Sequence, residues 1–171
     1  MPVIGMIGMH GTGKSTALLR WKARYGGRLE VYPLDDMRRQ YPGDPEKLAL
    51  VEECRASPRV CVIESARGYS SWLASLRPTE PVIMTYCSEA RAREFMEARS
   101  GKRLSAFWTA KRLGYESEGR YFNFSVKRLS PGQTSLFRVD DRATDWGPID
   151  EHFGKLFRGL HNSTLRGGSC R

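Results

Sequence analysis

The sequence predicts an α/β fold, a three-layer α/β/α sandwich around a five-stranded parallel sheet. Short apolar runs recur without the alternation that marks a half-exposed strand, so each strand is expected to be covered on both faces. Helix-like stretches separate these runs, which is typical of parallel βαβ units with right-handed crossovers. The 171 residues are enough for a single domain with a substantial core, expected over residues 1–161.

The first strand–helix unit carries a glycine-rich motif between a strand over 2–8 and a helix over 14–25. The motif reads GMHGTGKS and matches G-x-x-x-x-G-K-[ST]. A loop that wraps a polyphosphate turns its backbone N–H groups inward, and glycine tolerates the dihedral angles that this requires. Lys14, a predicted catalytic residue, would reach the β- and γ-phosphates, and the Ser15 hydroxyl would bind Mg²⁺ beside the positive end of the helix.

The motif therefore predicts a P-loop NTPase-type fold with ATP and Mg²⁺ as cofactors. The predicted nucleotide-binding residues are Gly8, Met9, His10, Gly11, Thr12, Gly13, Lys14, Ser15 and Thr16.

The second strand, expected over 28–34, leads into a pair of carboxylates followed by arginine. Asp35 is the candidate general base for an acceptor hydroxyl, because phosphoryl transfer needs a group that orients the hydroxyl and accepts its proton. Asp36 would hold magnesium through water or support Arg38, and Arg38 would clamp a phosphate or ribose of the acceptor. The alternative is an Asx turn with solvated arginines.

A third unit follows, with a helix over 44–56 and a strand over 59–64. Glu64 ends this strand, where ligands of parallel sheets bind, and is a candidate to orient Mg²⁺ or its water. It could instead contact the acceptor or act as the base, and Arg67 is a candidate acceptor ligand. The alternative is a surface acid at the end of a strand.

The remaining elements continue the alternation of strands and helices. They are a short helix over 70–76, a strand over 82–87, a helix from Ser88 to about Arg99, a short helix near 106–113, a strand over 135–139, a closing helix over 149–160 and a flexible tail over 162–171. The loop 140–143 either approaches the adenine or stays solvated, and Trp72 and Trp146 are expected to be packing residues.

The segment 99–128 is predicted to be a basic lid. It carries eight of the chain's lysines and arginines against two acids, in a chain of net charge +9, and six aromatic residues lie among them. Arg99 and Arg103 are the candidate lid arginines that would stabilise charge in the transition state. Interleaved cations and aromatics suit a nucleic acid. Alternatively, the aromatics pack in the core and the cations serve only ATP.

Composition adds two expectations about location. No apolar run is long enough to span a membrane, and no signal-peptide pattern is present. The four cysteines form no C-x-x-C pair, which favours free thiols in a reducing cytoplasm.

Four segments, GMHGTGKST, LDDMRRQ, VCVIESAR and EARSGKRL, resemble the small P-loop kinases, a group that includes nucleoside and nucleotide kinases. The D-D-x-R pattern is especially similar to the kinase domain of polynucleotide kinase. This resemblance covers about residues 2–104 and implies that Asp35 is the base, that Arg38 holds an acceptor phosphate, and that Arg99 or Arg103 contacts ATP. The sequence departs from it at Glu64, where polynucleotide kinase has Asp, and in lacking a phosphatase domain.

Together these features predict an ATP-dependent kinase that phosphorylates a hydroxyl on nucleic acid, with DNA favoured as partner. The acceptor would be a polynucleotide 5′-hydroxyl or a 5-hydroxymethyluracil base, as for a related phage DNA kinase, which would then act in the host cytoplasm. Two alternatives remain: a kinase of a free nucleoside, nucleotide or other small metabolite, and an NTP-binding switch that is not a kinase.

Overall fold

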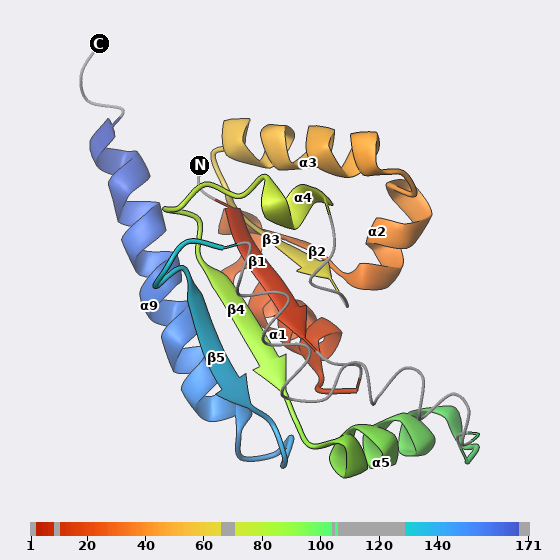
Figure 1. The fold of residues 1–171 in the computed structure, drawn as a ribbon. Helices are drawn as coiled ribbons and strands as arrows, with labels where there is room; N and C mark the ends of the chain where they lie inside the picture. Colours follow the sequence, from red (N-terminus) through yellow and green to blue (C-terminus); the bar gives the residue numbers. More distant parts are fainter. Residues whose placement is uncertain (1–2, 9–10, 66–70, 104, 106–128, 168–171) are drawn as a thin grey trace.

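A computed structural model describes residues 3–8, 11–65, 71–103, 105 and 129–167. Within these residues, five parallel strands form one sheet in the order β2-β3-β1-β4-β5 (Figure 1). The strands are β1 (Val3–Gly8), β2 (Leu29–Tyr32), β3 (Val60–Ser65), β4 (Val82–Tyr86) and β5 (Thr134–Arg138). The predicted α/β fold with a five-stranded parallel sheet is confirmed.

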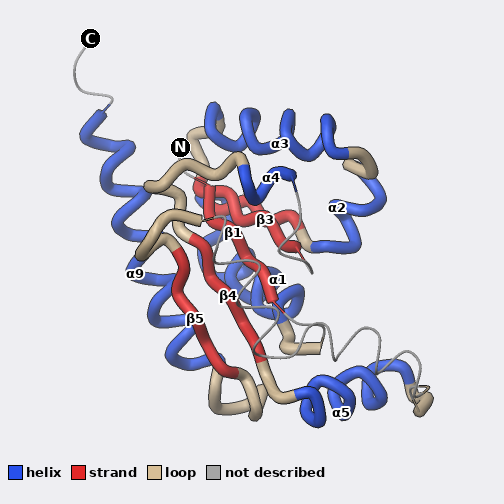
Figure 2. Tube along the Cα trace, viewed as in Figure 1, coloured by secondary structure: helices blue, strands red, loops and turns tan. Residues whose placement is uncertain are grey.

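Helices connect the strands and cover both faces of the sheet, as Figure 2 shows. They are α1 (Lys14–Tyr25), α2 (Leu34–Gln40), α3 (Asp44–Ala56), α4 (Ser71–Ala74), α5 (Glu89–Ser100) and α9 (Trp146–Gly167), with a 3₁₀ turn, η1 (Gly26–Arg28), after α1.

Two apolar clusters divide the core between the two faces. On one face, β-strand residues such as Ile7 and Ile63 pack against α2, α3 and α4. On the other, alternate strand residues such as Met6 and Val62 pack against α1 and α9. Because both faces of β1 and β3 are covered, all six residues of each strand are buried, which explains why these strands are continuous apolar runs.

The register of the central strands brings three carboxyl ends together. Met6 lies opposite Glu64 on β3, and Gly8 lies opposite Thr85 on β4. A Cβ on Gly8 would lie 2.2 Å from Thr85 Oγ1, so glycine is required for β1 to leave the sheet this close to β4. The phosphate loop therefore begins at the centre of the carboxyl edge.

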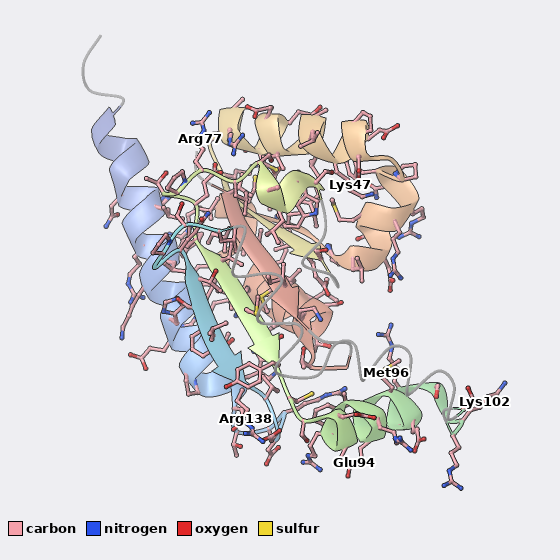
Figure 3. All side chains as sticks on the ribbon, in the orientation of Figure 1. Lys47, Arg77, Glu94, Met96, Lys102 and Arg138 are labelled. Carbon is pink, nitrogen blue, oxygen red and sulfur yellow. The ribbon has the colours of Figure 1, made fainter. Side chains whose placement is uncertain are left out.

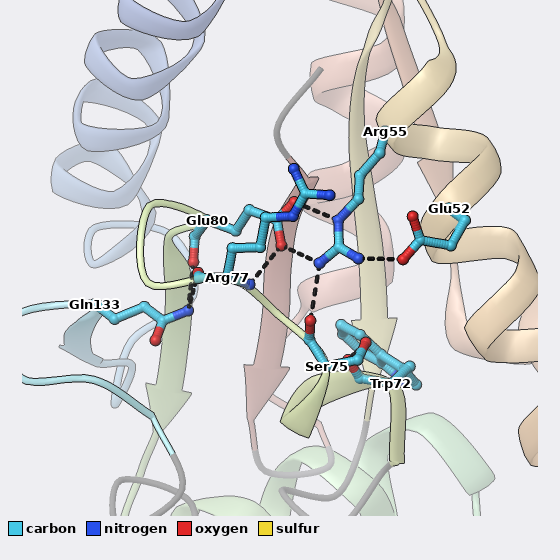
Figure 4. Close-up of polar contacts among 7 residues, drawn as sticks. All are labelled: Glu52, Arg55, Trp72, Ser75, Arg77, Glu80 and Gln133. Carbon is cyan, nitrogen blue, oxygen red and sulfur yellow. Dashed lines mark hydrogen bonds and ion pairs between the residues drawn. The ribbon is translucent and has the colours of Figure 1, made fainter.

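The opposite, amino edge of the sheet is held by a buried ion pair (Figure 4). The Arg55 guanidinium donates to both carboxylate oxygens of Glu80, at 2.8 and 2.6 Å, and to the Ser75 carbonyl at 2.8 Å. Glu80 also accepts from the Arg77 N–H, and its own carbonyl accepts from Gln133 Nε2. This network ties the end of α3 to the segments that enter β4 and β5.

Two elements differ from the predictions. The segment with Asp35 and Asp36 is the start of helix α2, not a loop, because Pro33 directly before it favours a helix start and Met37 is buried against the core. The closing helix starts earlier than predicted, at Trp146, and ends later, at Gly167. Its last turns cover residues that were predicted to belong to a flexible tail; a helix already anchored by Phe153 and Phe157 gains a backbone hydrogen bond with each added residue.

Other predictions fall partly outside the described residues. The short helix near 106–113 and most of the basic segment 99–128 lie there. The described cysteines, Cys54, Cys61 and Cys87, are buried thiols that belong to no disulfide, as expected. Among the described residues, no helix combines the length and the apolar character needed to cross a membrane.

Candidate active site

A cavity of about 600 Å³ opens at the carboxyl edge of the sheet. It is bounded by the phosphate loop, the first turn of α2, the end of β3, the end of α5 and the loop between β5 and α9. The lining residues are Gly11, Gly13, Lys14, Ser15, Thr16, Leu34, Asp35, Arg38, Glu64, Ala98, Arg99 and Arg142. Seven predicted site residues other than glycines thus lie around one space: Lys14, Ser15, Thr16, Asp35, Arg38, Glu64 and Arg99.

The wall formed by the phosphate loop and β3 is built around Glu64. Its Oε2 accepts a hydrogen bond from Ser15 Oγ at 2.9 Å, and its Oε1 lies 3.9 Å from Lys14 Nζ. Lys14 and Glu64 are both almost fully buried, at 5% and 3% exposure, so this ion pair is poorly screened by solvent. Glu64 Oε2 also accepts from the Leu34 N–H at 3.1 Å, which fixes the start of α2 against the phosphate loop.

The opposite wall carries the predicted acceptor residues. Asp35 and Arg38 both face the cavity from α2, and the Arg99 guanidinium of α5 lies 3.8 Å from the Asp35 carboxylate. Both partners of this pair are about three-quarters exposed, so it contributes little to stability. Asp36 instead pairs with Arg39 on the same helix and is not among the cavity-lining residues.

Helix α5 reaches beyond the carboxyl ends of β4 and β5 (Figure 1). Side chains along it and just after it, including Glu94 and Lys102, project into solvent (Figure 3). Gly101 ends the helix in a left-handed conformation. Arg103, the second predicted lid arginine, follows this turn, is exposed and does not line the cavity.

The remaining predicted residues fall into three groups. Gly8 and Thr12 belong to the phosphate loop but lie behind the cavity surface, and the buried Thr12 hydroxyl is 2.9 Å from that of Thr85. Thr16 is exposed and lines the cavity. Met9, His10 and Arg67 lie outside the described residues.

Arg142 is a cavity residue that sequence reasoning did not select. It lies in the loop after β5, donates to the Gly11 carbonyl, and stacks 4.1 Å from the centre of the Phe95 ring on α5. Burial lowers the pKa of Arg142; the nearby Cys87 acts against that shift and the Arg99 charge adds to it. The only signal in the sequence was the position of this loop after a parallel strand.

The donor set suits a magnesium ion. Ser15 Oγ and the Glu64 carboxylate offer hard oxygen ligands 2.9 Å apart, beside the phosphate loop. The described residues contain no cluster of three or more His, Cys, Asp or Glu side chains that would form a protein-only metal site. Where the phosphates of a substrate complete the coordination of Mg²⁺, the protein needs to supply only a few ligands.

Comparisons with known proteins agree with this fold. No protein-family model matches the chain, and no curated protein matches it in sequence. Among solved structures, a gluconokinase from Sinorhizobium meliloti 1021 superposes with a TM-score of 0.55 at 18% identity, over 95% of this chain and 97% of the other. A shikimate kinase from Bacteroides thetaiotaomicron gives a TM-score of 0.53 at 14% identity, over 93% and 98%. The protein TT1252 from Thermus thermophilus gives 0.52 at 18% identity, over 88% and 97%. At these identities the likeness shows the fold: a three-layer P-loop sandwich shared with small kinases.

Proposed function

We propose that the protein is an ATP-dependent, magnesium-assisted kinase whose acceptor is the hydroxyl of a small anionic metabolite. The observation that carries this proposal is the single cavity that holds both halves of a phosphotransfer site. Lys14, Ser15 and Glu64 form the donor half, and Asp35 and Arg38 form the acceptor half on the facing helix. A protein that only binds NTP as a switch, without transferring phosphate, would not need the acceptor half.

In the proposed donor half, Lys14 neutralises the β- and γ-phosphates and the phosphate-loop amides orient them. Ser15 and Glu64 would hold Mg²⁺, which when bound neutralises developing charge on the transferred phosphoryl group. Lys14 and Ser15 already contact Glu64 in this structure, so little rearrangement is needed for the three to act together.

In the acceptor half, Asp35 is the better candidate for the base. Glu64 is buried and accepts hydrogen bonds from Ser15 and from the Leu34 N–H, which commits its oxygens to holding the site. Asp35 lines the cavity, is largely exposed and, within the part of the chain that the structure describes, has only the 3.8 Å contact to Arg99. Its carboxylate is therefore available to orient an incoming hydroxyl and take its proton.

The charge of the cavity supports an anionic acceptor. The lining contains Lys14, Arg38, Arg99 and Arg142 against two acids, Asp35 and Glu64. Arg38 and Arg99 flank Asp35, where the acceptor would lie, and guanidinium groups bind carboxylate or phosphate through paired hydrogen bonds. A volume of about 600 Å³ is typical of sites for small molecules. The two fold neighbours with named activities are a gluconokinase and a shikimate kinase, both named for small acceptors.

A nucleic-acid hydroxyl is the second candidate. It is supported by the net charge of +9, by the D-D-x-R pattern at Asp35–Arg38, and by the basic–aromatic composition of residues 99–128. Most of that segment lies outside the described residues. The small acceptor is favoured by the size and charge of the described cavity.

Labelled phosphate transfer tests both candidates. The protein is incubated with γ-labelled ATP, Mg²⁺ and separate acceptors: polyhydroxy acids, phosphorylated sugars, nucleosides, nucleotides, 5′-hydroxyl oligonucleotides and 5-hydroxymethyluracil DNA. Label on a small acid or phosphate ester, lost in Lys14→Ala, is the expected result. Label on DNA alone, with a steep fall in binding as salt rises, would establish the second candidate instead. If none of the acceptors becomes labelled, the result would contradict kinase activity.

A further inference from the structure

The backbone carbonyl groups on the outer side of the phosphate loop need hydrogen-bond donors. When the loop amides point inward at a polyphosphate, the neighbouring carbonyl oxygens point outward, and a buried carbonyl needs a donor. Gly13 O accepts from the Ala17 N–H at 3.0 Å, as the first bond of α1. The two preceding carbonyls, of Gly11 and Thr12, lie before the helix begins at Lys14.

Both of these carbonyls are bonded by side chains from the same distant segment. Trp146 Nε1 donates to Thr12 O at 3.0 Å in a buried hydrogen bond, and Arg142 donates to Gly11 O. Arg142 lies in the connection from β5 to α9 and Trp146 is the first residue of α9, so both donors are more than 130 positions along the chain from the loop.

The contact from Trp146 is rigid. The indole is 5% exposed, and its ring meets that of Trp21 edge-on, with centroids 6.3 Å apart. Trp21 in turn stacks on Phe153 at 3.8 Å, so the indole is fixed between α1 and α9. A Cβ on Gly13 would lie 3.2 Å from Trp146 Nε1, which shows how closely the loop backbone lies against the ring.

The contact from Arg142 differs in character. Arg142 is exposed, lines the cavity and stacks on Phe95 of α5, so it joins the loop to a helix at the cavity mouth. Because Arg142 is exposed, its bond to Gly11 O competes with water, whereas the bond from Trp146 to Thr12 O is buried.

We infer that Trp146 is a positioning residue, which holds the phosphate loop in its nucleotide-binding conformation through the Thr12 carbonyl. This inference rests on the proposed use of a nucleotide, and it gives a specific role to a residue whose size and burial alone suggest only packing. A loop that is already shaped when the nucleotide arrives binds it without a further ordering cost.

Trp146→Phe tests this role, because phenylalanine keeps an aromatic ring in the core and removes the indole N–H. Trp21→Phe is the matched control. It removes the other indole N–H of the same cluster, which donates to Asp150 at 2.7 Å and does not touch the loop. Any general loss of core packing is therefore common to both variants.

The first measurement uses no nucleotide. Hydrogen exchange of the Ala17 amide, read by NMR, reports whether Gly13 O stays in place. Exchange about tenfold faster in Trp146→Phe than in Trp21→Phe is expected, from the usual cost of an unpaired buried carbonyl. Equal exchange in the two variants would overturn the inference.

The second measurement is MgATP affinity by calorimetry, with turnover of whichever acceptor is labelled. Trp146→Phe is expected to raise the Kd and KM for ATP about tenfold and to leave kcat within twofold, while Trp21→Phe changes neither. A wild-type protein that bound no MgATP would contradict the proposed function, yet the exchange measurement would still decide the role of Trp146.

Discussion

Asp35 and Asp36 are adjacent in sequence, but the structure gives them different surroundings. Asp35 faces the cavity and Arg99, whereas Asp36 turns to Arg39 on the outside of α2. A step of one residue along the helix thus separates a candidate base from a surface ion pair, a distinction that the sequence alone could not make.

These surroundings predict different effects for two like substitutions. Asp35→Asn is expected to lower kcat by about a hundredfold or more, the usual contribution of a general base, while leaving MgATP affinity within twofold. Asp36→Asn serves as the control and should keep most of the activity. Steady-state rates and calorimetry measure both, and a larger loss in Asp36→Asn would contradict the assignment of Asp35.

At Glu80, one residue supports several segments. Arg55 contacts both Glu80, which is buried, and Glu52, whose side chain is 66% exposed. Glu80→Gln removes the buried charge partner of the Arg55 guanidinium, so the free energy of unfolding should fall by about 3–5 kcal/mol. Glu52→Gln should cost less than about 1 kcal/mol, as for other exposed pairs. Urea titrations compare the two, and similar losses would show that burial of the pair does not matter.

At the scale of elements, α9 offers an internal comparison between two of its glycines. A Cβ at Gly159 would meet no atom within 4 Å, whereas one at Gly154 would lie 3.2 Å from the Tyr25 hydroxyl. Gly159→Ala is expected to stabilise the protein by about 0.5–1 kcal/mol, because alanine loses less backbone entropy in a helix. Gly154→Ala should gain less or lose stability; thermal unfolding measures both, and equal gains would contradict the crowding at Gly154.

Most of the helices and strands could be predicted from local sequence patterns. The strands and α1, α3 and α5 follow from apolar runs, from Gly13-Lys14 and Gly26-Gly27 at the ends of α1, and from Ser88 before α5, because these signals are local. Helix α2 was missed because it is short and its Asp–Asp start also suits a turn.

The candidate site likewise contains some residues that local sequence patterns predict and others that they do not. Lys14, Ser15 and Glu64 were predictable, since a motif and a strand end place them. Arg142 and Trp146 were not, because their bonds to the loop depend on how α9 packs beside α1. No local pattern encodes a contact between residues so far apart in the chain.

For the whole molecule, the buried ion pair predicts an acid limit to stability. Burial by itself would raise the pKa of Glu80, but hydrogen bonds from Arg55 and the Arg77 N–H, together with the Arg55 charge, hold it below its ordinary value of 4.5. A lowered carboxyl pKa stabilises the fold fully above the ordinary value, and this stabilisation is lost as pH falls through the folded-state value.

Stability should therefore be insensitive to Glu80 between about pH 5 and 7 and decline below about pH 4.5. Urea unfolding at a series of pH values checks this, with Glu80→Gln as the control. The difference in unfolding free energy between wild type and variant should shrink as the solution becomes acidic. A difference that stayed constant down to pH 3 would show that Glu80 is not the group responsible.

The strand order has a consequence for the synthesis of the chain. Of the five described strands, β1 is made before the others, yet it lies at the centre of the sheet, between β3 and β4, and does not pair with β2, which follows it in the chain. A nascent chain must therefore carry β1 unpaired until residues 60–65 emerge from the ribosome, and half-paired until residues 82–86 follow. The indole that closes the back of the phosphate loop emerges later still, at position 146. The phosphate loop therefore gains this hydrogen bond only after all five strands of the sheet have been made.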